Sequence, residues 1–232
     1  MFFGFVLALL LQIEFPTVAV ETGFVTEELS NERITELVQF IRLTPLSEEP
    51  EIESMDCFAV SENGLVAVGY DGEKAKIISV YNGDGEFQYG YRFNSHGSFE
   101  IAWSEDDIII YFWREAELVA VDASGSIQEV LAVPEDIKEN DTRLKQLEAN
   151  EKTIGEKTYR LQNDMGLLDY FAFSYSQLIV TQADGREVVF LDTTHAYMPT
   201  AIWSMAIRVF VFVSVPTAIF VVLKRRKRCK NQ

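Results

Sequence analysis

The spacing of apolar positions changes along the chain, and each change marks a different predicted element. Over residues 26–43 the apolar positions recur every three or four residues, which predicts an amphipathic helix that begins near Thr26. Its apolar face consists of Ile34, Leu37, Val38 and Ile41. Prolines and glutamates then predict a linker. We therefore assign residues 20–53 to a helix that docks on the following domain, and to an acidic linker.

From residue 54 to residue 196 the pattern is typical of strands. Short runs rich in Val, Ile, Phe and Tyr are separated by turn signals such as Asn63-Gly64 and Ser124-Gly125. A short helix near 141–151 and a hairpin near 153–161 interrupt the series. The predicted strands are 56–61, 64–70, 75–81, 86–93, 99–104, 107–113, 117–122, 126–132, 158–162, 169–174, 177–183 and 186–192.

A short motif recurs within this domain. It consists of two large apolar residues around an Ala, then a Ser, and a second apolar run follows after three residues. The copies begin at Phe58, at Ile101 and at Phe171, so the second lies 43 residues after the first and the third 70 residues after the second. We expect the motif to form the core of a repeated sheet, with core residues Phe58, Ala59, Ile101, Ala102, Trp103, Phe171, Ala172 and Phe173.

Four strands in about 40–45 residues is the period of a propeller blade. The units at 56–93 and 99–132 resemble β-propeller blades of the WD40-like or quinoprotein-like kind, although the Gly-His and Trp-Asp signatures of WD40 repeats are absent from the sequence. The resemblance implies four-stranded antiparallel blades. Only two full units and one three-stranded unit are evident, too few for a closed propeller. We therefore expect a mainly β fold of propeller-like repeats in an open or irregular arrangement, with a β-sandwich as the alternative.

The C-terminal apolar stretch predicts a transmembrane helix. Residues 201–223 are almost all apolar, and at about 1.5 Å per residue they are long enough to cross the roughly 30 Å hydrocarbon core. Five cations follow directly, namely Lys224, Arg225, Arg226, Lys227 and Arg228. Cytoplasmic flanks carry the excess of Lys and Arg. We therefore predict a single-pass cell-membrane protein with a span at 199–223, a basic cytoplasmic tail at 224–232 and the β domain outside.

Arg208 is the one charged residue within this predicted span. By helical rise it lies about 10 Å below the outer end. Its side chain either extends back to the outer interface or pairs with an acidic residue in the transmembrane helix of a partner protein.

At the other end, residues 1–19 contain about a dozen unbroken apolar residues, which suits a signal peptide cleaved after Ala19. An uncleaved short anchor and an incomplete start that lacks its basic residues are the alternatives.

Charge is divided between the domain and the tail. Residues 16–200 contain 35 acidic and 13 basic residues, a net charge of −22, whereas the chain beyond residue 201 has only basic ones. A domain this acidic is repelled by nucleic acid, so we expect no nucleic-acid partner. The expected partners are the lipid bilayer and a protein that the sequence does not identify. Cys57 lies in an apolar strand pattern and is expected to be a buried thiol.

The sequence contains no complete catalytic or metal-binding motif. His96 and His195 belong to no zinc pattern, and a GxSxG elbow is missing, so we assign no catalytic, cofactor or metal residue. Asn140 begins a glycosylation sequon. We expect an interaction or sensing module without catalytic activity. The alternatives are a membrane-tethered extracellular hydrolase that uses a carboxylate pair, and an accessory subunit of a membrane complex.

Overall fold

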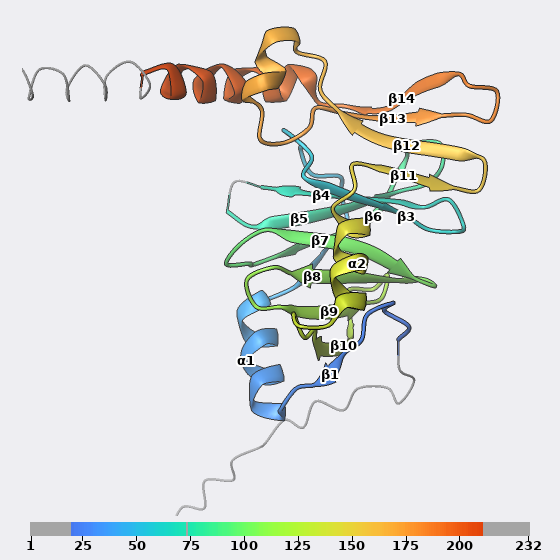
Figure 1. Ribbon diagram of the computed structural model, residues 1–232, viewed down its shortest axis with the longest axis vertical. Coiled ribbons are helices and arrows are strands. Elements are labelled where there is room, and N and C mark those ends of the chain that lie inside the picture. The colour runs from blue at the N-terminus through green and yellow to red at the C-terminus, as the bar shows by residue number, and fades with distance from the viewer. Residues whose placement is uncertain (1–19, 73, 211–232) are drawn as a thin grey trace, which may run out of the picture.

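The computed structural model describes residues 20–72 and 74–210, and these residues form a mainly β, antiparallel protein (Figure 1). The prediction of that fold class is confirmed. Three four-stranded meanders follow one another along the chain, and within the described part they do not close into a ring. The first sheet contains β3 (Cys57–Val60), β4 (Val66–Asp71), β5 (Lys76–Tyr81) and β6 (Phe87–Phe93). The second contains β7 (Phe99–Ser104), β8 (Asp107–Phe112), β9 (Glu117–Val121) and β10 (Ile127–Ala132). The third contains β11 (Glu151–Ile154), β12 (Lys157–Gln162), β13 (Gln177–Thr181) and β14 (Glu187–Asp192).

The segment before the first sheet covers the outer edges of two sheets. Strand β1 (Glu27–Glu28) pairs with β10, and β2 (Thr44–Leu46) pairs with β6. Between them lies the predicted amphipathic helix, α1 (Asn31–Ile41). It begins later than expected because residues 27–28 are already paired as an edge strand, and the side chain of Ser30 accepts a hydrogen bond from the Arg33 backbone N–H as its cap.

An ion pair fixes α1 to the second sheet. Arg33 donates through Nε to Glu117 Oε1 at 2.7 Å and through Nη2 to Glu117 Oε2 at 3.0 Å. The Glu117 side chain is buried, and this pairing raises the pKa of the Arg33 guanidinium. A two-pronged contact of this kind fixes orientation as well as contributing energy.

The first sheet is the central layer, because it is buried on both faces. Alternate residues of β3 point in opposite directions, so that Cys57 and Ala59 pack against the second sheet, whereas Phe58 and Val60 pack against the third. Near-continuous apolar runs are the expected pattern for strands with two buried faces. Cys57 is a free, buried thiol, as the sequence predicted.

The two outer sheets differ in what covers their far faces. The far face of the second sheet packs against Leu144 and Leu147 of α2 (Lys138–Leu147), together with apolar residues near position 20. The far face of the third sheet carries a row of charges in which Arg160 lies 4.0 Å from Glu151 and 3.1 Å from Glu187. One outer face is therefore covered by a helix, and the other carries charged side chains.

The third sheet differs from the third repeat unit that the sequence predicts. The strand expected at 169–174 is wrong, since residues Gly166–Phe171 form a short 3-10 helix, η1. Strand β11 supplies the missing first strand, so the third unit has four strands rather than three. The motif copy that begins at Phe171 therefore lies in the connection between β12 and β13. Residues 163–176 form this connection, whereas only 72–75 and 113–116 link the corresponding strands of the other two sheets.

Residues 194–210 are helical and extend away from the sheets (Figure 1). Among the described helices, none combines the length and apolar character that crossing a membrane requires. The predicted span at 199–223 falls partly in this helix and partly in 211–232, outside the described residues. The predicted signal segment at 1–19 and the basic tail at 224–232 also lie outside them.

The close approach of the first two sheets generates a stability prediction at Gly69. A Cβ at this position would lie 2.5 Å from Cys57 Sγ and 2.8 Å from the Phe99 ring. We expect Gly69→Ala to lower the free energy of unfolding by about 1–3 kcal/mol through overpacking, measured by chemical denaturation of the purified full-length protein. Gly83→Ala is the matched control, because its nearest atom would be 3.8 Å away. Equal stability of the two variants would contradict the tight contact.

Candidate binding site

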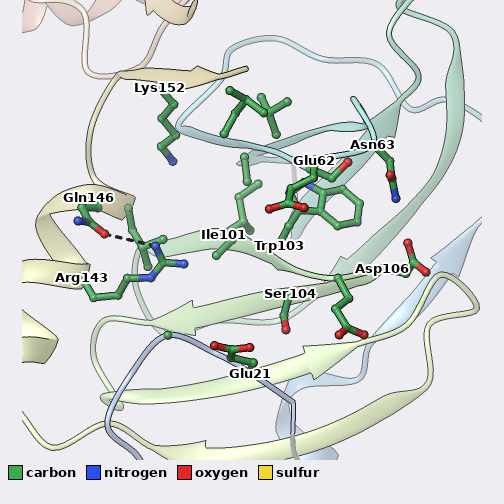
Figure 2. A pocket seen from close by; sticks show the side chains of 18 residues that line it. Glu21, Glu62, Asn63, Ile101, Trp103, Ser104, Asp106, Arg143, Gln146 and Lys152 are labelled. Atoms are coloured by element: carbon green, nitrogen blue, oxygen red, sulfur yellow. Dashed lines mark hydrogen bonds between the residues drawn. The ribbon is translucent and has the colours of Figure 1, made fainter. Parts of the chain in front are cut away.

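The first strands of the three sheets lie together and border a cleft. Strand β3 contacts both β7 and β11, and α2 lies against β7 (Figure 1). The cleft at this junction has a volume of about 840 Å³ and is bordered by α2, by the ends of β3 and β7 and by the start of β11 (Figure 2). Clefts of this size accept small organic ligands.

One side of the cleft is cationic. Arg143 comes from α2 and Lys152 from β11 (Figure 2). Lys152 Nζ donates to the Phe58 carbonyl at 2.6 Å and lies 4.8 Å from the centroid of the Phe58 ring. Burial lowers the pKa of the Lys152 ammonium. Neither cation forms an ion pair within the described chain.

The opposite side of the cleft is acidic. Glu62 comes from the turn after β3, and Glu105 and Asp106 form the turn between β7 and β8 (Figure 2). Glu105 has a φ of 51°, a left-handed conformation that is unfavourable for a residue with a side chain. Trp103 borders the cleft beside Glu62 (Figure 2), and its indole N–H is buried without a hydrogen-bond partner. Strain and unpaired donors of this kind are concentrated at functional sites.

The N-terminal segment completes the border of the cleft. Asn140 of α2 is fully buried; its side-chain oxygen accepts from the Val25 N–H, and its amide donates to the Val25 and Pro134 carbonyls. These bonds hold the segment that brings Glu21 and Gly23 to the cleft. The sequon at Asn140 is therefore unsuited to glycosylation in the folded protein, because its amide is buried and already bonded.

A second buried charge lies close by on β7. Glu100 faces a small cavity of about 50 Å³, also bordered by Asp56 and Glu148, and one of its carboxylate oxygens is buried without a partner. Burial raises the pKa of Glu100 to about 8, while the nearby Lys152 opposes the shift. Burial also raises the pKa of the Cys57 thiol in the same cavity, which makes this cysteine unreactive.

The expected repeat core is divided between the interior and the surface. Four of its members are buried in the first and second sheets, namely Phe58, Ala59, Ile101 and Ala102. Trp103 is half-buried at the cleft. Phe171 and Ala172 are half-buried in and beside η1, whereas Phe173 is 77% exposed. The last three residues do not join the core because they belong to the connection that contains η1.

Arg208, the predicted membrane-partner residue, lies at the third sheet's end of the molecule. Its guanidinium carbon is 4.0 Å from the centroid of the Phe173 ring. The predicted cytoplasmic anchor, residues 224–228, lies outside the described residues. The structure therefore brings Arg208 together with one expected core residue, Phe173. Neither of these two residues borders the cleft.

Sequence reasoning missed the charged residues of the cleft. Arg143 and Glu62 are ordinary polar residues of a helix and a turn, and no spacing links them. Glu100 carried a signal, since it is an acid between Phe99 and Ile101 in an apolar strand run. His96 stacks on Phe40 and lies 2.8 Å from Glu115, away from the cleft.

Compared with protein-family models, curated proteins and solved structures, the chain matches none of them.

The raised pKa of Glu100 predicts a pH-dependent stability. The folded state favours the neutral carboxyl, so this group's stabilising contribution is complete below its ordinary pKa of about 4.5 and is lost as the pH rises towards about 8. We expect Glu100→Gln to be nearly neutral at pH 4.5 and to increase the free energy of unfolding by about 5 kcal/mol at pH 9. Chemical denaturation at the two pH values checks this, and a pH-independent difference would contradict it.

Proposed function

We propose that this chain is a membrane-anchored, extracytoplasmic interaction module that binds a ligand with charges of both signs in the cleft. The segment 201–223 is proposed as the anchor, with the tail at 224–232 in the cytoplasm. The three sheets are proposed to be propeller-like blades in an open arrangement, with α2 lying where a further blade would pack.

The division of charge across the cleft supports this proposal most strongly. Arg143 and Lys152 lie on one side, and Glu62 and Asp106 lie on the other (Figure 2). Arg143 and Lys152 are half-buried without ion-pair partners, which is unfavourable, whereas Glu62 and Asp106 are exposed. A ligand whose anionic group meets the cations and whose cationic group meets the carboxylates would pair both sets. The flat indole of Trp103, which also borders the cleft, suits an aromatic or apolar part of the same ligand.

Binding without catalysis is proposed because, among the described residues, no hydroxyl at the cleft is hydrogen-bonded to a base. The hydroxyl of Ser61 accepts from the Leu65 N–H, a structural turn contact, and neither histidine borders the cleft. A hydroxyl acts as a nucleophile only when a base lies within hydrogen-bond reach of it.

The native cysteines allow a direct test of the proposed topology. We expect a membrane-impermeant maleimide to label Asp184→Cys, an exposed turn of the third sheet, in sealed cells. Cys229 should react only after the membrane is permeabilised, and the buried Cys57 only after denaturation. The unsubstituted protein is the control. Labelling of Cys229 in sealed cells to the same extent as position 184 would contradict the orientation.

The ligand prediction uses 4-fluorophenylalanine, a zwitterion with an aromatic ring. We expect its fluorine NMR signal to broaden with the full-length protein, whereas its N-acetyl and carboxamide derivatives, which each lack one charge, should bind at least about tenfold more weakly.

Variants locate this binding in the cleft. Lys152→Gln and Glu62→Gln should each weaken binding by about tenfold, because each removes one charge-assisted contact. Lys145→Gln, an exposed position on the same helix as Arg143, is the matched control and should leave binding unchanged. Equal binding of all three probes, or an equal effect of Lys145→Gln, would refute the two-signed site.

A further inference from the structure

Large apolar side chains with high exposure are gathered in one part of the described chain. Leu167, Tyr170 and Phe173 are 81%, 82% and 77% exposed, and all three belong to η1 or its end. The helix at 194–210 adds further exposed residues, namely Ile202, Trp203, Ile207, Val209 and Phe210. Outside these two segments, only Val25, Val188 and Val189 are large, apolar and exposed among the described residues. Clusters of this kind mark surfaces that contact a partner or a membrane.

The two segments form one unit. Met165, at the start of η1, packs with Tyr197 and Ala201 of the helix. The Tyr197 hydroxyl accepts hydrogen bonds from the backbone N–H groups of Phe173 and Ser174, at 3.0 and 3.1 Å. The short helix η1 is therefore held beside the first turns of the helix at 194–210 (Figure 1).

Arg208 connects the same two segments. Its guanidinium carbon lies 4.0 Å from the centroid of the Phe173 ring, so the side chain extends from the helix to the end of η1. A long basic side chain within an apolar stretch commonly extends to the interface, where its charge meets water and lipid phosphates. Contact with an aromatic face stabilises a cation in that position.

We propose that η1, Phe173 and the first turns of the helix lie in the headgroup region of the outer leaflet, with the Arg208 guanidinium directed to lipid phosphates. This inference rests on the proposed membrane anchor. The sequence indicates that lipid covers this exposed apolar patch, which consists of Leu167, Tyr170, Phe173 and the exposed residues of the helix. The apolar stretch of the helix continues to residue 223 and is followed directly by five cations. Tyr and Trp beside such a stretch are the side chains that favour a membrane interface.

The position of η1 in the fold supports the same occupant. Only the third sheet has a long connection at this point, and that connection carries the exposed apolar residues. It lies next to the helix rather than on the open, polar face of the third sheet. An amphipathic element of this kind inserts about 5–10 Å into the boundary between headgroups and acyl chains.

The test measures lipid contact in nanodiscs that hold one copy of the full-length chain in phosphatidylcholine. In a Cys229→Ser background, bimane is attached through Tyr170→Cys or, as a second reporter, Leu167→Cys. Asp184→Cys, an exposed turn of the same sheet, is the matched control. We expect spin-labelled lipid, with the label at the headgroup or high on the acyl chain, to quench both reporters and to leave position 184 bright. Aqueous iodide should show the opposite order.

The outcomes separate the two proposals. A reporter on a disc-bound chain that is quenched no more than position 184 overturns the lipid contact and leaves the anchor intact. A chain that stays in the aqueous fraction during disc assembly overturns both. Protection from iodide that arises only with two copies per disc identifies the patch as an interface between copies, which also overturns the inference.

Discussion

The structure depends on burying both faces of the first sheet. Each residue of β3 is packed, with Cys57 and Ala59 towards the second sheet and Phe58 and Val60 towards the third. The layers approach closely enough at Gly69 that a single Cβ would overlap two neighbouring side chains. A central layer of this kind contributes apolar burial twice per strand, at about 25 cal/mol for each Å² removed from water. It also brings β7 and β11, the first strands of the two outer sheets, into contact with β3.

This convergence of first strands creates the cleft. Strands β7 and β11 contact β3 from opposite sides. Helix α2 covers the far face of the second sheet, where another sheet could otherwise pack. The long side chain of Arg143 extends from α2 into the space that α2 does not fill. Lys152 enters the same space from the first residues of β11. The charges of the cleft are therefore positioned by the elements that complete the core, which explains why Arg143 and Lys152 are half-buried without ion-pair partners.

The sequence predicted the parts of the fold that repeat locally. Alternating apolar positions and Gly turns located most strands, and the amphipathic pattern located α1, because both signals act over a few residues. The third unit was misaligned because Phe171, Ala172 and Phe173 reproduce the composition of a core strand without its partners. Only tertiary pairing shows that β11 is the first strand. The cleft was not predictable, since Glu62 and Lys152 come to border the same space only after the third sheet packs on the first.

The third sheet contributes to both proposed contacts of the molecule. Its first strand carries Lys152 at the cleft, and the connection after its second strand carries η1. Exposing Leu167, Tyr170 and Phe173 to water is unfavourable, and the remaining surface of the domain is strongly acidic. An acidic domain is repelled by anionic lipid at a distance, so a short apolar element beside the anchor is the contact that could hold it near a bilayer. The same misleading motif that resembled a core strand would then be apolar because it faces lipid instead of protein.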